Sequence, residues 1–250
     1  LKGQAHALYL AREHLAGPCV IIFVDTLSDA DLSTLEQRPV DGVLFVKEVQ
    51  DPRRFGVVVE QDDRIVKLIE KPDSMDNRKA VIGIYYVRDG AALVDAIEYI
   101  LEHKIQTKGE YYIANALQVM MDRGAHFVSE AVSMWEDCGE PETMLHTNRY
   151  LLSHGSGNGS PPPCECRHTA VIQPVYIAPT AKIENSVVGP YVTIGDHVHL
   201  QGSIVRDAII EEGCHIESTA FEHSLIGRNV TIRGALKKLN IGDNDVVDFG

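Results

Sequence analysis

A single carboxylate follows an apolar run at a position where α/β proteins commonly bind ligands. Asp25 comes directly after Cys19-Val20-Ile21-Ile22-Phe23-Val24, which is bounded by turn-forming residues. Such a run predicts a strand covered on both faces in a parallel or mixed sheet. Open α/β sheets bind ligands in the crevice beyond the carboxyl ends of their strands, so Asp25 is a candidate binding residue. The alternative is structural, because Asp25 also suits a turn or a helix N-cap.

The cysteines suggest little further chemistry. They are five in number and scattered, which favours free thiols in a reducing compartment over a disulfide framework. Cys164 and Cys166 are closely spaced and His168 is near them, but no second Cys or His pair at metal-ligand spacing follows. We therefore expect thiols in a linker there rather than a metal site.

Helix and strand patterns alternate over the first part of the chain. Apolar residues at helical spacing predict a helix over residues 3–15, which ends at Gly17-Pro18. Further strands are predicted over residues 42–49, 56–60, 65–69 and 81–87, and helices over residues 91–101 and 111–123. This alternation indicates an α/β layered domain over residues 1–152.

A compositional break separates this domain from a periodic segment. Gly, Ser and Pro fill most of the start of residues 153–168, which predicts a linker. Beyond it, aliphatic residues recur with a period of six, which is typical of a parallel β-helix whose flat sides each take six residues. We expect this β-helix over residues 169–250. The predicted inward anchors are Ile177, Ile183, Val188, Ile194, Leu200, Ile204, Ile210, Ile216, Ile226 and Ile232.

Seven short motifs occur in a fixed order over residues 3–142. They are Gly3-Gln4-Ala5, Val24-Asp25, Phe55-Gly56-Val57-Val58, Glu70-Lys71-Pro72, Gly83-Ile84-Tyr85, Gly109-Glu110-Tyr111-Tyr112-Ile113 and Trp135-Glu136-Asp137-Cys138-Gly139-Glu140-Pro141-Glu142. Each is short, but their order is specific. In this order the chain resembles the sugar-1-phosphate nucleotidyltransferases of the glucose-1-phosphate thymidylyltransferase or UDP-sugar pyrophosphorylase type. Some members of that family also end in a left-handed β-helix.

The resemblance implies a fold and a set of roles. The fold would be α/β, with a Rossmann-like mixed sheet that is incomplete at its N-terminus, followed by a left-handed parallel β-helix of hexapeptide repeats. Lys71, Asp25 and Asp137 would be the catalytic residues, and the two acids would hold Mg²⁺. The substrate-binding residues would be Gly3 at the nucleotide base, Glu70 at the sugar hydroxyls, Lys71 at the sugar phosphate, and Gly56, Gly83 and Glu110 around them.

The implied reaction transfers a nucleotidyl group from UTP or dTTP to a hexose 1-phosphate and releases pyrophosphate. It brings several negative charges together, so it needs charge neutralisation and in-line positioning more than a proton-transfer base. Two carboxylates and one hard Mg²⁺ ion meet the first need, because such an ion bridges phosphate oxygens. Lys71 would stabilise the attacking phosphate, and Glu70 would orient the sugar.

The family's glycine-rich loop, Gly-Gly-x-Gly-Thr-Arg-Leu, does not occur in the 250 residues. Such a loop cradles a triphosphate with backbone amides. We therefore expect the sequence to be a fragment of a longer enzyme and the 250-residue chain alone to be catalytically silent.

Two other functions stay open on the sequence alone. The chain could be a non-catalytic, oligomerising regulatory subunit that keeps a sugar-phosphate pocket. It could instead be an acyltransferase, with His197, His199, His215 or His223 on the β-helix as the base.

The composition of the chain disfavours some classes of binding partner. The net charge of −13 disfavours binding to nucleic acid. The sequence contains no run of about eighteen apolar residues, so it predicts no membrane-spanning helix. We expect a soluble, cytoplasmic protein. Resemblance to hexapeptide-repeat proteins implies a homo-oligomer, commonly a trimer, formed through the β-helix.

Overall fold

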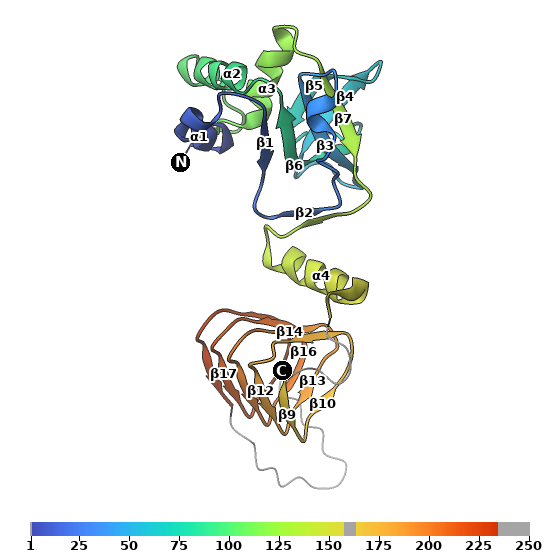
Figure 1. The fold of residues 1–250 in the computed structure, drawn as a ribbon, viewed down its shortest axis with the longest axis vertical. Helices are drawn as coiled ribbons and strands as arrows, with labels where there is room; N and C mark the ends of the chain where they lie inside the picture. The colour runs from blue at the N-terminus through green and yellow to red at the C-terminus, as the bar shows by residue number, and fades with distance from the viewer. Residues whose placement is uncertain (1, 158–163, 235–250) are drawn as a thin grey trace. The chain divides into compact units, whose positions relative to one another are not determined.

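The structure is a computed structural model that describes residues 2–157 and 164–234. The chain forms two compact units, Leu1–Asp137 and Cys138–Gly250 (Figure 1). Leu1, residues 158–163 of the predicted linker and residues 235–250 of the predicted β-helix lie outside the described residues. Within the described part of the chain, no helix is long and apolar enough to cross a membrane.

A mixed sheet forms the centre of the first unit. Its strands run in the order β5-β4-β6-β3-β7, and β1 pairs with β6 beside β4. Only the β3–β7 pair is parallel; the other pairs are antiparallel. The strands are β1 (Cys19–Ile22), β3 (Gly42–Glu48), β4 (Gly56–Gln61), β5 (Arg64–Glu70), β6 (Lys79–Val87) and β7 (Phe127–Ala131). The mixed sheet predicted from the sequence is confirmed.

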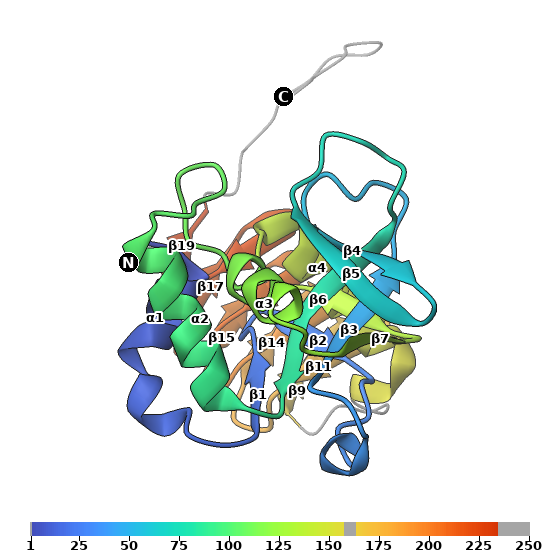
Figure 2. The same cartoon turned by 90° about the horizontal axis from the view of Figure 1, so that it is seen from above.

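Both faces of this sheet are covered. Helices α1 (Gln4–Leu10), α2 (Gly90–Glu102) and α3 (Ile113–Asp122) pack together over one face (Figure 2). That face buries Leu44 and Val46, whereas the alternate residues Val43 and Phe45 are buried in a second cluster on the other face. Burial on both faces explains the continuous apolar run of β3, because successive side chains point to opposite sides of a sheet.

Two predicted elements differ from the structure near the N-terminus. The helix expected over residues 3–15 divides into α1 and a short 3₁₀ turn, η1 (Arg12–His14). The strand expected to be covered on both faces is β1, in which Val20 is 43% and Ile22 is 52% exposed. That prediction is wrong because β1 pairs only with β6 among the described residues and buries only the Ile21 side.

Gly83 marks the point where β6 changes partners on one side. Before it, Ala80 of β6 pairs with Val57 of β4, and after it Ile84 pairs with Ile22 of β1. Gly83 has φ of 82°, which favours glycine. Its carbonyl accepts a hydrogen bond of 2.9 Å from the backbone N–H of Phe23, where the chain leaves β1. The chain then turns through Asp25 into β2 (Thr26–Ser28).

The second unit is a parallel β-solenoid, which confirms the predicted parallel β-helix. Its strands stack on three sides, and every strand pair within it is parallel (Figure 1). The strands are β9 (Glu165–Arg167), β10 (Ala170–Val171), β11 (Val175–Ile177), β12 (Lys182–Glu184), β13 (Val187–Val188), β14 (Val192–Ile194), β15 (His199–Gln201), β16 (Ile204–Ile210), β17 (His215–Glu217), β18 (Ala220–Ile226) and β19 (Thr231–Arg233).

Aliphatic ladders fill the solenoid and confirm the repeat, with one exception. Ile177, Ile194, Ile210 and Ile226 pair in register from turn to turn on one side. The predicted anchor Ile204 is instead 46% exposed, and its neighbour Val205 is fully buried. The prediction is wrong by one residue because this side of the coil is shorter than six residues, and a shift of one residue in a strand reverses the side chain.

Helix α4 (Pro141–Leu151) lies in the same compact unit as the solenoid. It begins with a capping box formed by Glu140 and Thr143. The two compact units divide between Asp137 and Cys138. Asn148 and Arg149 of α4 bind side chains and backbone of the solenoid, which accounts for the place of α4 in the second unit. The domain boundary expected after residue 152 stays a prediction.

Cys164 and Cys166 form a disulfide, with Cα atoms 5.5 Å apart. The expectation of free linker thiols is therefore wrong for this pair. Cys166 lies on β9, opposite Ile183 of β12, so the pair belongs to the first strand of the solenoid rather than to a linker. Cys19, Cys138 and Cys214 are free cysteines.

Candidate active site

The two acids singled out by the sequence lie on adjacent segments. Strand β8 (Trp135–Asp137) pairs antiparallel with β2, and Asp137 is the direct partner of Thr26. Asp25 is therefore one residue from the partner of Asp137, although 112 positions separate the two acids in the sequence. The Thr26 hydroxyl donates a 2.7 Å hydrogen bond to the Ile82 carbonyl of β6, which fixes this segment on the central sheet.

Gly83 lies directly beneath the turn that carries Asp25. A Cβ atom at this position would come within 2.8 Å of Phe23 Cδ2 and 2.9 Å of Thr26 Oγ1. The close approach of the turn to β6 therefore requires glycine. This is a structural reason for Gly83, in addition to the substrate contact predicted for it.

Glu70 and Gly56 face each other where the β4–β5 hairpin is open. They are paired residues, and a Cβ on Gly56 would lie 2.8 Å from Glu70 Oε2. Burial raises the pKa of the Glu70 carboxyl, and the positive charges of Lys71 and Lys108 partly offset this rise. A half-buried carboxylate without a ligand is costly, so this oxygen pair is suited to accept hydrogen bonds from a bound polyol.

Lys71 follows β5 in a left-handed backbone conformation, with φ of 46°. Its backbone N–H donates a 3.0 Å hydrogen bond to the Phe55 carbonyl. Its ammonium Nζ donates a 3.2 Å hydrogen bond to the Tyr112 hydroxyl, which is the main cause of a raised pKa for Lys71. Lys71 is therefore held as a protonated cation beside Glu70.

An aromatic contact links the lysine side of the site to β8. The ring of Phe55, whose carbonyl binds Lys71, meets the ring of Trp135 edge-on with centroids 5.0 Å apart. Trp135 is two residues before Asp137 on β8. Two sequence motifs that are far apart, those of Phe55 and Trp135, are therefore in direct contact.

Gly3 and Glu110 lie on the helical side of the same unit. Gly3 has φ of 110°, and a Cβ there would come within 2.6 Å of the Tyr111 carbonyl oxygen. That carbonyl accepts a 3.0 Å hydrogen bond from the Ala5 N–H at the start of α1. Glu110 is exposed in a short bridge with Thr107, one residue before Tyr111. The hydrogen bond from Lys71 to Tyr112 connects this segment to the Glu70 side of the site.

Two residues near Lys71 were not expected from the sequence. Lys108 Nζ donates a 3.2 Å hydrogen bond to the Lys71 carbonyl, which adds a second cation beside Glu70. Tyr112 supplies the hydroxyl bound by Lys71. A basic residue directly before Gly109-Glu110 was the available signal for Lys108, whereas Tyr112 has no signal in the sequence because its role depends on packing.

The acids suit a hard divalent cation. Asp25 and Asp137 offer carboxylate oxygens, the donors that Mg²⁺ prefers, and Asp25 is exposed. Over residues 2–157 and 164–234, no group of three or more His, Cys, Asp or Glu side chains gathers as a closed metal site.

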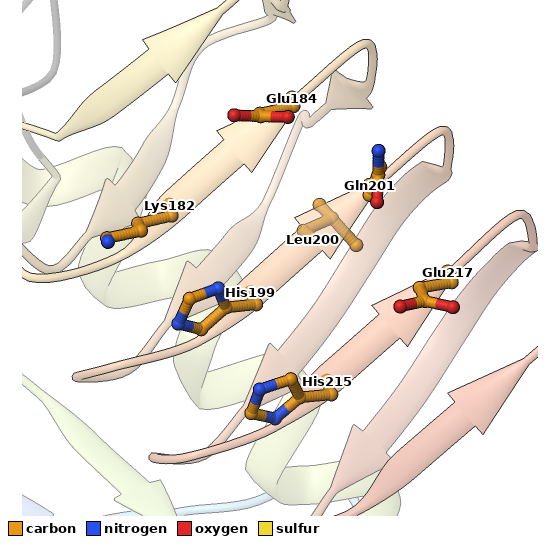
Figure 3. A pocket seen from close by; sticks show the side chains of 7 residues that line it. All are labelled: Lys182, Glu184, His199, Leu200, Gln201, His215 and Glu217. Carbon is orange, nitrogen blue, oxygen red and sulfur yellow. The ribbon is translucent and has the colours of Figure 1, made fainter.

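The solenoid carries its histidines on its outer surface. His199 and His215 stack on successive strands with ring centroids 4.8 Å apart, in line with Lys182 (Figure 3). Glu184, Gln201 and Glu217 form a parallel row across the same groove (Figure 3). His223 is instead bound between Asp207 and Glu142 at 2.8 Å each, so it serves the contact of α4 with the solenoid.

Comparison with known proteins connects the chain to one family. Residues 1–154 match the family model described as nucleotidyl transferase. The glucose-1-phosphate thymidylyltransferases of Streptomyces antibioticus and Streptomyces griseus are each 27% identical to the chain. The matches cover 99% and 97% of this chain and 76% and 75% of those proteins.

A solved structure matches as well. A Bacillus anthracis protein assigned as a glucose-1-phosphate thymidylyltransferase, crystallised with sucrose, superposes with a TM-score of 0.50 at 25% identity. The match covers 63% of this chain and 63% of that one, so the chain spans less than two thirds of that relative.

Proposed function

Because the chain belongs to the nucleotidyl transferase family, a family of enzymes, we propose that it supplies the sugar-phosphate half of a nucleotidyl-transfer site. The reaction transfers a nucleotidyl group from UTP or dTTP to a hexose 1-phosphate and releases pyrophosphate. It is proposed for a protein that carries a glycine-rich triphosphate loop together with this chain. The 250-residue chain alone is expected to bind the sugar phosphate without turnover.

The observation that carries the proposal is the pairing of Thr26 with Asp137. It brings the two acids to adjacent segments, and the Phe55–Trp135 contact ties those segments to the backbone that holds Lys71. Two acids on adjacent segments, a protonated lysine and a half-buried glutamate carry the charges that a phosphate ester with hydroxyl groups would need.

Each group has a separate task in the proposed reaction. Asp25 and Asp137 would hold Mg²⁺, which would supply charge neutralisation to the phosphates when bound. Lys71 and Lys108 bind the sugar phosphate and keep its oxygen directed at the α-phosphorus of the triphosphate. Glu70 accepts hydrogen bonds from sugar hydroxyls, and Gly56 leaves room for the sugar beside that carboxylate.

Gly3, Gly83 and Glu110 complete the proposed substrate site. Gly3 would offer backbone groups to the nucleotide base from the start of α1. Gly83 would let the backbone of β6 lie close to the sugar, as it already lies close to Phe23. Glu110 would assist at the sugar-phosphate side, next to the Lys108 that precedes it by two residues.

Calorimetric titration with α-D-glucose 1-phosphate tests the binding half of the proposal. We expect the chain to bind glucose 1-phosphate saturably. The affinity of the Lys71→Ala variant should be lower by at least about tenfold, because a charge-assisted contact to the phosphate is lost. Lys67→Ala is the matched control, since Lys67 lies on the same strand outside the motif. Equal binding by the Lys71→Ala variant would rule out this assignment.

The catalytic half is tested by pyrophosphate release. A protein that carries the glycine-rich loop should release pyrophosphate from UTP or dTTP when glucose 1-phosphate and Mg²⁺ are present, and the Asp25→Asn variant should lose most of this activity. Binding of the sugar phosphate without release for any common nucleoside triphosphate would favour the regulatory-subunit alternative. The acyltransferase alternative would place its base in the groove that contains His199 and His215. Binding of acetyl-coenzyme A to the chain tests this alternative.

The solenoid is also proposed to join copies of the chain, most simply as a trimer. An apolar column runs along one outer face through the register-paired residues Ala170, Val187, Ile204 and Ala220. We also propose a cytoplasmic location, because the substrates of the proposed reaction are UTP or dTTP and a hexose 1-phosphate.

A further inference from the structure

The ammonium of Lys71 has a defined partner before any substrate is bound. Its Nζ atom donates a 3.2 Å hydrogen bond to the Tyr112 hydroxyl and lies 5.5 Å from the centre of the Tyr112 ring. These two distances place the ammonium beyond the hydroxyl at the edge of the ring, so the contact of Tyr112 with the lysine is the hydrogen bond.

Tyr112 is itself firmly placed. It is only 4% exposed and forms the N-cap of α3, between the buried residues Tyr111 and Ile113. A tyrosine fixed by such packing has few rotamers to lose, whereas a free lysine has many. The contact thus transfers the rigidity of α3 to a side chain that would otherwise be flexible.

The backbone of Lys71 is constrained from the other side. Its φ of 46° directs the chain away from β5, and the Lys108 ammonium binds the Lys71 carbonyl at 3.2 Å. Backbone and side chain of Lys71 are both held by the segment 108–112, which joins the site to α3.

We propose that Tyr112 is a positioning residue that holds the Lys71 ammonium in the place where the sugar phosphate binds. The inference rests on the proposed function, because it presumes that Lys71 meets a phosphate. It goes beyond the motif on which the family resemblance depends, since Tyr112 occupies the variable position of Gly-Glu-Tyr-x-Ile. A lysine oriented in advance binds a phosphate with a smaller loss of conformational entropy.

Removal of one hydroxyl group tests this role. Tyr112→Phe keeps the ring and the packing but loses the hydrogen bond to Lys71. Tyr86→Phe is the matched control, because Tyr86 is equally buried and its hydroxyl has no hydrogen-bond partner among the described residues. Both variants and the unsubstituted chain are titrated with α-D-glucose 1-phosphate by calorimetry, and the Lys71 ammonium is titrated by NMR in each.

We expect Tyr112→Phe to weaken glucose 1-phosphate binding roughly three- to tenfold, the cost of ordering one otherwise free lysine side chain when the phosphate binds. We also expect the pKa of Lys71 to fall, because the Tyr112 hydrogen bond is the main cause of its rise. A merely structural tyrosine would not change the titration of a lysine side chain. Tyr86→Phe should match the unsubstituted chain in both measurements.

Binding by the Tyr112→Phe variant as tight as that of the unsubstituted chain would overturn the inference and leave the proposed function intact. An equal loss in Tyr86→Phe would also overturn it, since the effect would then be general to buried tyrosines. If the unsubstituted chain does not bind glucose 1-phosphate at all, the proposed function fails and the inference fails with it. The three outcomes are distinguished in one set of titrations.

Discussion

At the scale of single residues, glycines shape the candidate site as much as charged groups do. Gly83 and Gly56 each face an atom that an added Cβ would approach within about 3 Å, which at Gly83 belongs to Phe23 or Thr26 and at Gly56 is the movable carboxylate end of Glu70. The two glycines lie next to Asp25 and Glu70, respectively, in the folded chain. Their positions indicate that the backbone forms the floor of the site.

Gly83→Ala should destabilise the first unit. The new methyl group would meet Phe23 and Thr26, and alanine also disfavours the φ of 82°. We expect a loss of about 2–4 kcal/mol in the free energy of unfolding, measured in urea. Binding of a divalent cation should weaken as well, because the turn that carries Asp25 would move.

Gly124→Ala separates the two causes. Gly124 also has a positive φ, 104°, but a Cβ there meets no atom within 4 Å. This variant should lose only the conformational part, about 1 kcal/mol. Equal losses in the two variants would show that the close contact at Gly83 is unimportant.

The residue scale also shows what sequence reasoning can and cannot supply. The order of the motifs, through the family resemblance, was enough to predict Asp25, Glu70, Lys71 and Asp137 as site residues, and their roles stay predictions. It did not reveal the Tyr112 hydroxyl or the Lys108 contact, since both depend on how the segment 107–112 folds back on Lys71.

At the scale of elements, polar contacts attach α4 to the solenoid. Asn148 is 8% exposed, donates to the Tyr191 carbonyl at 3.2 Å and accepts from the Thr193 hydroxyl at 2.6 Å. Arg149 forms a two-pronged pair with Asp207 at 2.7 and 2.6 Å. Such bidentate pairs orient as well as attract.

Asn148→Ala should loosen α4. The substitution leaves the Tyr191 carbonyl and the Thr193 hydroxyl without their partner, which costs about 1–3 kcal/mol. Amide hydrogen exchange of α4 should become faster by the corresponding factor. Met144→Ala is the control, since Met144 is an exposed residue of the same helix and should leave the exchange unchanged. Unaltered exchange in Asn148→Ala would contradict the proposed attachment.

His223 makes this attachment depend on pH. Its hydrogen bonds to Asp207 first, and to Glu142 second, raise the pKa of the imidazole. Arg149 from α4 also approaches the ring, at 3.0 Å from Nδ1. Because the pKa of His223 is higher in the folded chain than in the unfolded chain, its protonated form stabilises the fold. This stabilisation is complete below the pKa of the unfolded chain, about 6.5, and is lost as the pH rises through the pKa of the folded chain.

The comparison is between the thermal midpoints of the chain and of His223→Gln from about pH 5.5 to about pH 8.5. We expect the chain to exceed the variant most at the acidic end and the difference to shrink as the pH rises. The effect should be modest, because the imidazole is exposed to solvent. A difference that grows with pH would have the wrong sign for this account.

Element boundaries were less predictable than element types. The apolar run of β1 indicated a strand but not its single partner, because the same pattern fits a strand with one or two neighbours. The period of six located the solenoid, whereas the inward residue was displaced from Ile204 to Val205 where one side of the coil is shorter. Local pattern determines the kind of element, and tertiary packing determines its edges.

At the scale of the whole molecule, the two units have different supports. The sheet of the first unit is held by helices on one face and by a cluster of aliphatic and aromatic side chains on the other. The solenoid is held by ladders of buried aliphatic residues. Burial of each such side chain contributes about 1.5–3 kcal/mol to the free energy of folding. The sequence predicted both architectures, because one depends on alternating elements and the other on a short repeat.

Association through the solenoid should depend on its apolar outer column. Ile204 protrudes from this column between Val187 and Ala220, so Ile204→Glu would place a charge on each copy at the contact. We expect light scattering to give three times 27.6 kDa for the chain and a single 27.6 kDa for the variant. Tyr176→Glu, an exposed position on β11, is the control. A trimer in both variants would place the contact elsewhere.

The account's central claim is that the acids and the lysine bind one ligand together. Mn²⁺, a paramagnetic substitute for Mg²⁺, should enhance the ³¹P relaxation of glucose 1-phosphate bound to the chain, because the metal held by Asp25 and Asp137 would lie close to the phosphate held by Lys71. The Asp25→Asn/Asp137→Asn double variant should still bind the sugar phosphate but lose this enhancement. Enhancement of equal size in the double variant, or its absence from the unsubstituted chain with both ligands bound, would contradict the claim.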